Sequence, residues 1–333
     1  MATIVEVARR AAVSPTTVSH VLNGTRFVSH AARERVEQAI ALLGYRRNEV
    51  ARSLRRGSSH TLGLVLPDSA NPFFAEVGRA IELAAFEAGF SLILCNSENA
   101  VEKERLYLGV LARRQVDGVI LVSAGERSDS VSTFLRSGLP VVAMDRPQPG
   151  LSLDTVLADH RQGGWLATRH LVRLGHRRIA CIGGPPRLGP GLQRVAGYRR
   201  ALREEGLAFD RALLVHGDFH PAAGASAARA LLRLRRPPTA IFACNDLMAL
   251  GVLRAAAELG RRVPGDLALV GYDDIELAAF AAPPLTTVAQ PKREMGREVV
   301  RLIVNRIRDG RLPPQREELP VSLRIRESCG ASP

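Results

Sequence analysis

Two short helices joined by a tight turn, close to the N-terminus, are the feature that most constrains the fold. Thr3 can cap a helix over Ile4–Ala11, whose apolar residues recur at helical spacing. Ser14 has the chemistry of an N-cap, and Pro15 stands at the first position of a second helix, where its missing N–H costs nothing. This second helix, Pro15–Leu22, is apolar on one side and hydrogen-bonding on the other. This order of a capped helix, a tight turn and a second helix with one polar face is typical of a helix-turn-helix module. The second helix of such a module enters the DNA major groove.

A third helix and an excess of positive charge support the same interpretation. We expect the third amphipathic helix from about Ala31 to Leu43, with Gly44 ending it. Residues 1–60 hold ten Arg against four Glu, so they carry +6 of the net charge of +13. A general preference for arginine explains part of this charge, because the whole chain has only two lysines. A basic module of this kind favours binding to phosphates, with an affinity that falls as salt rises.

The chain after the polar stretch Gly57–His60 has a different pattern, in which apolar β-rich runs alternate with helical stretches. This alternation predicts parallel sheets with crossover helices, in two successive lobes of similar size. The expected strands are 61–67, 91–96, 118–123, 140–145, 179–183, 213–218, 239–245 and 267–272. The expected helices are 74–88, 101–114, 129–137, 162–174, 192–205, 222–234 and 247–259.

Polar residues follow several of these strands, where a ligand binds in a doubly wound fold. Asn71 follows the first strand, Asp145-Arg146 the fourth, and Asn245 and Asp273 follow two strands of the second lobe. Carboxylate, amide and guanidinium groups together satisfy both the donor and the acceptor side of vicinal hydroxyls. The sequence therefore predicts a polar cleft suited to a sugar.

Several segments resemble the lactose-repressor (LacI/GalR) family of bacterial transcription regulators, and the resemblance covers essentially the whole chain. It is carried by Ala2–Ile4 (ATI), Thr17–Asn23 (TVSHVLN), Val50–Leu54 (VARSL), Gln193–Tyr198 (QRVAGY), Gly271–Ala278 (GYDDIELA) and Val288–Lys292 (VAQPK). Within the family these segments are most similar to ribose repressors and next to purine repressors.

The resemblance implies an all-α helix-turn-helix headpiece with a hinge helix, followed by an α/β two-lobed domain like that of periplasmic binding proteins. That domain would contain two doubly wound parallel sheets. We expect the DNA-binding domain over 1–57, with the hinge helix at about 48–56, and the effector and dimerisation domain over 58–333. The N-lobe would comprise about 61–160 and 291–321, and the C-lobe about 161–290 and 322–333.

The resemblance also implies a set of DNA contacts. Thr16, Thr17 and His20 would face base edges in the major groove. Leu54 would be an apolar wedge in the minor groove, where the hinge helices of a dimer pair and kink the duplex. The residues expected to contact DNA are Ser14, Thr16, Thr17, His20, Asn23, Arg26, Arg52, Leu54 and Arg55.

For the effector, the resemblance implies D-ribose as an inducer that releases a homodimer from a near-palindromic operator. The matching ligand positions are Asn71, Phe73, Phe74, Asp145, Arg146, Arg194, Phe219, Asn245, Asp273 and Gln290. A purine repressor would carry an aromatic residue where this chain has Arg146. The alternative is a co-repressed regulator that binds a purine, a nucleoside, another pentose or a sugar phosphate.

Two other classes of protein are disfavoured. An enzyme is not indicated, because no G-x-G-x-x-G or P-loop motif follows a strand, and we expect no cofactor and no metal site. A secreted sugar-transport protein is disfavoured by the DNA-binding module and by an N-terminus that lacks a signal peptide. No run approaches the length of a membrane span, and the four cysteines form no C-x-x-C pair. We therefore expect a cytoplasmic protein with buried thiols.

Overall fold

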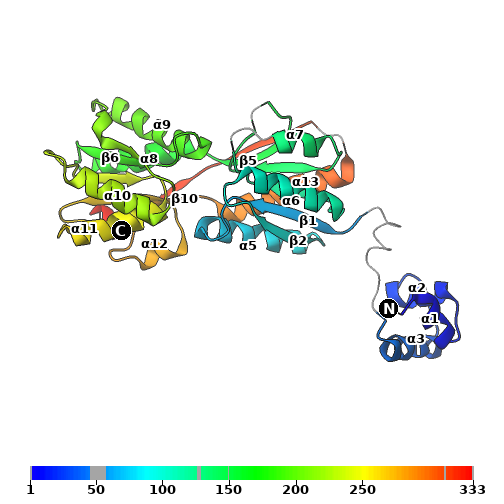
Figure 1. Ribbon diagram of the computed structural model, residues 1–333. Coiled ribbons are helices and arrows are strands. Elements are labelled where there is room, and N and C mark those ends of the chain that lie inside the picture. The colour runs from blue at the N-terminus through cyan, green and yellow to red at the C-terminus, as the bar shows by residue number, and fades with distance from the viewer. Residues whose placement is uncertain (1, 46–57, 126–128, 149, 311–312, 332–333) are drawn as a thin grey trace. The chain divides into compact units, whose positions relative to one another are not determined.

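The computed structural model describes residues 2–45, 58–125, 129–148, 150–310 and 313–331 (Figure 1). The chain divides into two compact units, Met1–Ser59 and His60–Pro333, and each is described on its own. Within the described ranges, no helix combines the length and the apolar character that spanning a membrane requires.

The N-terminal unit is a three-helix module. Its helices are α1 (Ile4–Arg10), α2 (Pro15–Asn23) and α3 (His30–Leu43). A capping box of Thr3 and Glu6 starts α1, and Ser14 caps α2 by accepting a hydrogen bond from the Thr17 N–H (3.1 Å). Small and β-branched side chains fill the core, and they are Val7, Ala8, Ala11, Val18, Val21, Val36 and Ala39. The helix-turn-helix predicted from the sequence is confirmed.

The first lobe of the second unit contains a six-stranded sheet in the order β11-β5-β4-β3-β1-β2, and all its strand pairs are parallel. Its strands are β1 (Thr61–Leu66), β2 (Ser91–Asn96), β3 (Gly118–Leu121), β4 (Val141–Met144), β5 (Asp154–Ala158) and β11 (Arg316–Leu319). Its helices are α5 (Pro72–Glu87), α6 (Val101–Arg113), α7 (Asp129–Leu135) and α13 (Lys292–Asp309).

The second lobe repeats the architecture, with the strand order β12-β10-β9-β8-β6-β7. Its strands are β6 (Ile179–Gly183), β7 (Leu214–His216), β8 (Ala240–Ala243), β9 (Ala268–Asp273), β10 (Thr286–Ala289) and β12 (Ser322–Arg324). Its helices are α8 (His160–Arg173), α9 (Gly189–Glu204), α10 (Pro221–Leu232), α11 (Asp246–Glu258) and α12 (Glu276–Phe280), with 3-10 turns at Arg211–Leu213 and Glu327–Cys329.

The predicted fold class is confirmed, with one correction to the sheets. We expected two parallel sheets, but the edge strand β12 pairs antiparallel with β10. Several helices also begin two or three residues earlier than expected, at Pro72, His160 and Gly189. At Pro72 the reason is local: Asn71 caps α5 and the proline takes its first position, so both precede the apolar residues that mark the helix in the sequence.

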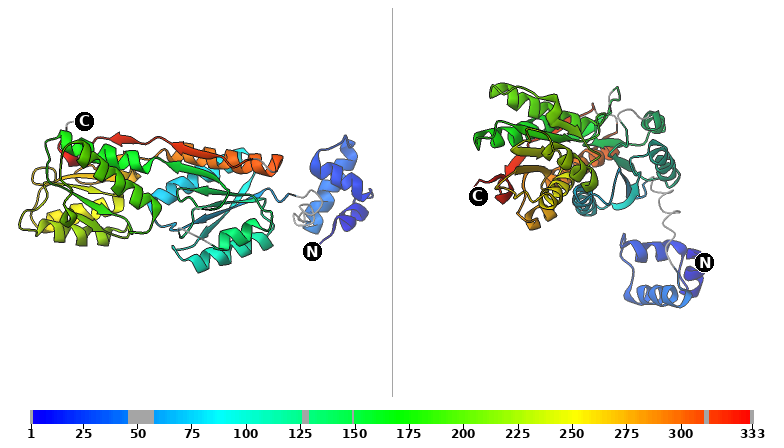
Figure 2. Two further views of the ribbon diagram at one scale, coloured as in Figure 1. Left: turned by 90° about the horizontal axis from the view of Figure 1, so that it is seen from above. Right: turned by 60° about the vertical axis from the view of Figure 1, so that its left-hand side comes forward.

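The described chain passes between the lobes at three places. It leaves the first lobe between β5 and α8, returns between β10 and α13, and leaves again between β11 and β12. Figure 2 shows the last passage, where β11 and β12 follow one another in red. The passages after β5 and β10 lie next to the carboxyl ends of the neighbouring strands β4 and β9. Residues of both lobes therefore come together at these strand ends.

Glycines allow helices α8 and α9 to pack backbone against backbone. A Cβ atom at Gly164 would lie 2.0 Å from the Arg194 carbonyl oxygen, and one at Gly197 would lie 2.1 Å from that of Arg161. Both positions must be glycine, because even a methyl side chain would overlap the backbone of the facing helix. This close approach holds Arg194 of α9 against the first turn of α8.

Gly197→Ala is expected to destabilise the protein by about 3 kcal/mol, because the added methyl group must push the two helices apart. The measurement is urea denaturation, followed by circular dichroism and by the fluorescence of Trp165, the single tryptophan, which lies on α8. Gly109→Ala on α6 is the matched control. Its Cβ meets only the flexible end of Arg113 at 3.4 Å, so alanine should be neutral or stabilising. Equal effects of both variants would contradict the packing argument.

Candidate functional site

A small cavity between the lobes brings together nine of the ten residues expected to bind a ligand. It is lined by Asn71, Phe73, Phe74, Asp145, Arg146, Leu188, Pro190, Arg194, Phe219, Asn245 and Asp273. The tenth expected residue, Gln290, lies beside it and contacts Asp273. The cavity holds about 30 Å³, roughly the share of one water molecule in the liquid, whereas ligand pockets usually exceed about 300 Å³. A larger ligand therefore requires side chains or lobes to move.

Helix α5 supplies the apolar wall of the cavity. The side chain of Asn71 accepts a hydrogen bond from the Phe73 N–H (3.0 Å) and so fixes the first turn of the helix. Phe73 and Phe74 follow in that turn, both buried, with ring centroids 5.1 Å apart in an edge-to-face arrangement. These rings present apolar surface that suits the face of a sugar ring or of a base.

Asp145 and Arg146 form the polar wall of the first lobe at the end of β4. Asp145 has a left-handed backbone (φ 61°), and its Oδ1 lies 3.1 Å from Nε2 of His160. Burial would raise the pKa of Asp145, but His160 and the two nearby arginines outweigh burial and lower it. Arg146 donates from Nη1 to the Asn99 side chain (3.0 Å) and to the Ser123 carbonyl (2.8 Å). Its buried Nε has no partner among the described residues, so one donor stays unused.

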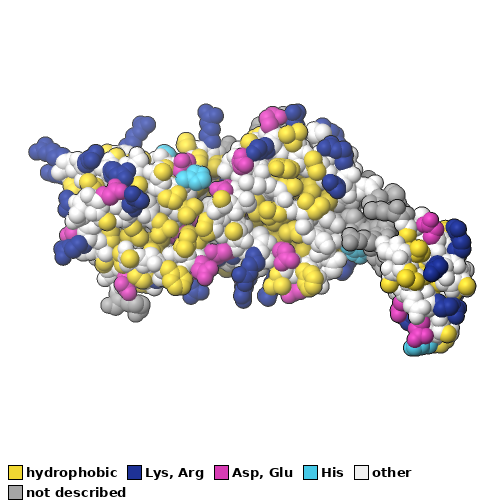
Figure 3. Space-filling view, turned by 60° about the horizontal axis from the view of Figure 1, so that its bottom comes forward, with side chains coloured by type: hydrophobic (Ala, Val, Ile, Leu, Met, Phe, Trp, Pro, Cys, Tyr) yellow, Lys and Arg dark blue, Asp and Glu magenta, His cyan; other side chains and the backbone are white. Residues whose placement is uncertain are grey.

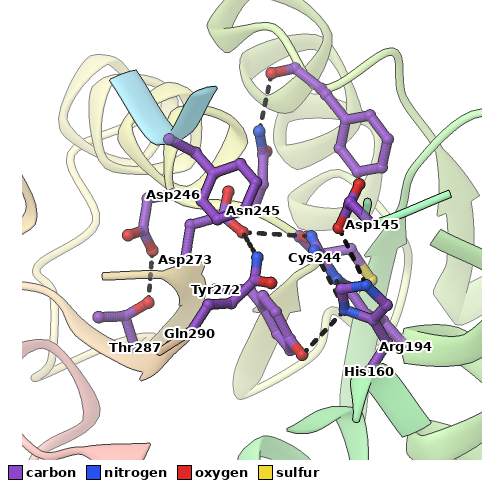
Figure 4. A network of polar contacts seen from close by, with 12 residues as sticks. Asp145, His160, Arg194, Cys244, Asn245, Asp246, Tyr272, Asp273, Thr287 and Gln290 are labelled. Atoms are coloured by element: carbon purple, nitrogen blue, oxygen red, sulfur yellow. Dashed lines mark hydrogen bonds and ion pairs between the residues drawn. The ribbon is translucent and has the colours of Figure 1, made fainter. Parts of the chain in front are cut away.

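Among the cavity residues of the second lobe, Arg194 contacts several neighbouring groups (Figure 4). Its Nη1 donates to the Cys244 carbonyl oxygen (2.6 Å) and lies 3.4 Å from Asp273 Oδ1. Its guanidinium also stacks 3.8 Å from the centre of the Tyr272 ring, a cation–π contact. A buried charge is tolerated only where it is paired in this way.

Asn245, Asp273 and Gln290 complete this wall. Asn245 caps α11 through Met248 N–H (3.0 Å) and donates to the Phe219 carbonyl oxygen (2.9 Å). Gln290 donates from Nε2 to Asp273 (2.7 Å), while its buried Oε1 has no partner among the described residues. Burial raises the pKa of Asp273 to about 6, although Arg194 and Gln290 act in the opposite direction.

His160 is a residue of the site that sequence reasoning missed. It is the first residue of α8, directly after the chain leaves β5. Besides Asp145, its ring lies 3.3 Å from the Tyr272 hydroxyl and accepts from Arg194 at 3.4 Å (Figure 4). Burial, together with the charge of Arg194, lowers the pKa of His160. The one sequence signal was its place directly after Asp159, a residue type that caps helices.

The expected DNA-contacting residues of the N-terminal unit lie on or near α2. The Ser14 and Thr17 hydroxyls are 2.9 Å apart, and Thr16 is exposed. His20 Nδ1 lies 2.9 Å from the Thr25 hydroxyl, and Asn23 donates to the Ser19 carbonyl oxygen (2.8 Å). Arg26 is exposed after the helix. The expected contacts Arg52, Leu54 and Arg55, with the hinge helix, lie outside the described residues.

No group of three or more His, Cys, Asp or Glu side chains within the described ranges is arranged to hold a metal ion. Cys95, Cys181, Cys244 and Cys329 are free and buried.

The raised pKa of Asp273 predicts a pH-dependent stability. An unfolded aspartate loses its proton near pH 3.8, but folded Asp273 keeps it until about pH 6. Between these values the folded state binds more protons, so the contribution of Asp273 to stability is lost as pH rises, by up to about 3 kcal/mol. Asp273→Asn does not titrate, and its stability relative to wild type should rise between pH 4 and 7. Denaturation at a series of pH values measures this difference, and a difference independent of pH would contradict it.

Comparison with known proteins identifies both units. Residues 3–48 match the family described as bacterial regulatory proteins, lacI family, and residues 168–329 match a periplasmic binding protein-like domain. The HTH-type transcriptional repressor PurR of Aliivibrio fischeri (strain MJ11) is 41% identical over 313 residues, which cover 93% of each chain.

Two solved structures resemble this chain over nearly its whole length, and a third resembles it over 80%. The transcriptional regulator CelR in complex with cellobiose is 40% identical, with a TM-score of 0.76, and 98% of this chain and 100% of that chain are covered. The lac repressor dimer bound to operator and an anti-inducer is 30% identical, with a TM-score of 0.88 and 99% of both chains covered. A LacI family regulator from Enterococcus faecium with bound ribose is 32% identical, with a TM-score of 0.74, covering 80% of this chain and 98% of that one. The chain belongs to the lacI family of bacterial regulatory proteins and is a DNA-binding transcriptional repressor of that family.

Proposed function

We propose that this repressor is a homodimer that binds a near-palindromic operator and is released by a small neutral sugar, D-ribose or a closely related pentose. The sugar would bind in the cavity between the lobes. The observation that carries the proposal is the balance of charge in this cavity, where two arginines face two carboxyl groups.

The pairing of these charges favours a neutral ligand over a sugar phosphate. Arg194 is paired with Asp273, and Arg146 lies close to the charges of Asp145 and Glu104. A phosphate would have to displace these carboxylates to find a free cation. A neutral polyol needs no such exchange, because each of its hydroxyls can donate to a carboxylate and accept from a guanidinium at the same time.

The identity of the residue after Asp145 favours a sugar over a purine. Here it is Arg146, whose guanidinium offers hydrogen-bond donors instead of an aromatic face for a base. The unused atoms Arg146 Nε and Gln290 Oε1 add one donor and one acceptor at or beside the cavity. The ribose-bound Enterococcus faecium regulator supports a pentose, whereas the name PurR of the Aliivibrio fischeri relative supports a purine co-repressor as the second candidate.

An exposed apolar face supports association with a second copy. Helix α5 exposes Leu83 and Phe86, and the neighbouring edge strand β2 exposes Leu94. Helix α12 of the other lobe exposes Leu277 and Phe280, the latter by 79%. Figure 3, in which the side carrying α5 and α12 comes forward, shows apolar side chains gathered on both lobes. Apolar patches of this kind mark protein interfaces, and the lac repressor relative is described as a dimer.

On DNA, each subunit would place α2 in the major groove of one half-site. The exposed Thr16, with Thr17, His20 and the flanking Ser14, Asn23 and Arg26, would read base edges or phosphates. Arg52, Leu54 and Arg55 would act at the centre of the operator, with Leu54 as the minor-groove wedge.

Fluorescence anisotropy with the protein's own upstream promoter DNA, at fixed salt, tests the effector. D-ribose is expected to release the DNA, and hypoxanthine and guanine are expected to have no effect. Tightening by a purine would overturn the sugar assignment in favour of a co-repressor. A stronger response to ribose 5-phosphate than to ribose would contradict the argument from paired charges.

Asp273→Ala should abolish the sugar response while leaving the operator affinity of the sugar-free protein unchanged. Loss of the buried carboxyl group should weaken sugar binding more than about 30-fold, because a sugar hydroxyl then loses its charged hydrogen-bond acceptor. Asp266→Ala is the matched control, since this aspartate pairs with Arg262 on the surface. A normal response from Asp273→Ala, measured by calorimetry and anisotropy, would show that the ligand binds elsewhere.

Thr16→Ala and Leu54→Ala test the mode of DNA binding. Each should lower the affinity for the operator about tenfold, because each removes a contact that depends on base sequence. The affinity for unrelated DNA should change less than about twofold, since phosphate contacts carry it. Equal losses on both DNAs would contradict the assigned base readout and wedge.

A further inference from the structure

An ion pair on the first lobe contacts the backbone of the second lobe next to the cavity. Glu76 projects from α5 of the first lobe, and its Oε2 lies 2.6 Å from Nζ of Lys292, the first residue of α13. The other oxygen, Oε1, accepts a hydrogen bond from the backbone N–H of Glu276 (3.0 Å), the first residue of α12 in the second lobe. Glu76 therefore pairs with the Lys292 ammonium group through one oxygen and accepts from a backbone N–H of the opposite lobe through the other.

Lys292 makes the reciprocal contact. Its Nζ donates to the backbone carbonyl oxygens of Asp273 (3.2 Å) and Asp274 (2.5 Å), at the end of β9 in the second lobe. Its side chain is 16% exposed and that of Glu76 is 32% exposed. An ion pair at this depth is less screened than a surface pair and keeps a defined geometry.

The turn that Lys292 holds is unusual in its backbone. Asp273 and Asp274 both have positive φ angles, 110° and 51°, a region that L-residues other than Asn and Asp rarely occupy. Such a turn persists only where its surroundings hold it. The second lobe supplies some anchors, through Arg326 to the Asp274 side chain (2.7 Å) and Asp246 to the Ile275 N–H (2.9 Å). Lys292 supplies the anchor from the first lobe.

We propose that Glu76 and Lys292 form a latch that holds the Asp273–Asp274 turn against the first lobe, and so couples closure of the lobes to the position of Asp273. When the lobes separate, Lys292 leaves the two carbonyl oxygens and Glu76 leaves the Glu276 N–H. Any ligand that needs Asp273 in place then binds more weakly. The effect on effector binding rests on the function proposed above, whereas the latch itself does not.

The latch also joins the cavity to the exposed apolar face. The same helix, α5, has the cavity residues Phe73 and Phe74 in its first turn, Glu76 in its second and the exposed Phe86 near its end. A helix is a stiff element, so a displacement at Glu76 is carried to the face that we propose as the subunit interface. Through the hydrogen bond from Glu276 to Glu76, the second lobe therefore contacts α5, a helix of the proposed subunit interface, directly.

Amide hydrogen exchange in the effector-free protein tests the latch without reference to any ligand. Glu76→Met and Lys292→Met should each speed exchange of the amides of residues 274–278 about tenfold or more, because the turn and the Glu276 N–H lose their anchor. The double variant should exchange no faster than the faster single variant, since the two residues act as one unit. Lys292→Arg, which keeps the charge, should recover most of the protection.

Arg293→Gln and Glu294→Gln are the matched controls, because both are exposed neighbours of Lys292 on α13 and remove one charge of each sign. They should leave exchange at 274–278 unchanged. Unchanged exchange in Glu76→Met and Lys292→Met would overturn the latch. Equally fast exchange in the controls would also overturn it, because the effect would then follow from net charge alone.

Calorimetry with D-ribose provides the second measurement. Glu76→Met and Lys292→Met should weaken binding about 5- to 50-fold, within the usual range of coupling between two sites. Unchanged affinity together with faster exchange would overturn the coupling of the latch to Asp273. If wild type binds no D-ribose, the proposed effector fails, and the exchange comparison alone decides whether the latch exists.

Discussion

The buried guanidinium of Arg194 is the group on which the site depends. It lies between both lobes' polar residues: Asp273 and the Cys244 carbonyl oxygen on one side, His160 and, through it, Asp145 on the other. A buried cation without partners is strongly unfavourable, so these groups must converge around it. The glycine-mediated contact of α8 with α9 brings Arg194 to this position. The packing of two helices thus determines where the charges of the cavity meet.

Helix α5 links three properties of the second unit that would otherwise be separate. Its N-cap and first turn form the apolar wall of the cavity, its second turn contacts the opposite lobe, and its last turns carry exposed apolar side chains. A ligand changes an equilibrium between two arrangements only if its contacts differ between them. In this chain the second turn of α5 contacts the opposite lobe, so movement of the lobes changes its contacts. The apolar surface that would report the change is at the end of the same helix.

Much of the site could be predicted from the sequence, because its polar residues follow strands. Asp145, Asn245 and Asp273 stand where an apolar run ends, and Asn71 stands in the loop that follows such a run. The topology of parallel sheets brings such positions to one edge. His160 could not be found in this way, since its neighbours Asp145, Arg194 and Tyr272 come from three distant segments. Strands β5, β10, β11 and β12 were not predicted either, and β11 shows the physical reason most clearly. Its sequence, REEL, is charged and exposed, so its pairing with β5 is determined by the sheet edge and not by hydrophobicity.

The backbone of the site carries an independent sign of function. Asp145, Phe219 and Asp273 are three of the ten expected ligand residues, and all have positive φ angles. Each such residue costs up to about 1–3 kcal/mol, so the conformations must be stabilised by contacts elsewhere. The contacts are visible: His160 holds Asp145, Asn245 holds the Phe219 carbonyl, and Gln290 with Lys292 holds Asp273. Among the described residues, nine other than glycine have positive φ angles, and three of these line this one cavity. Backbone conformations of this kind, held in place by the surrounding contacts, are what a pre-organised binding site requires.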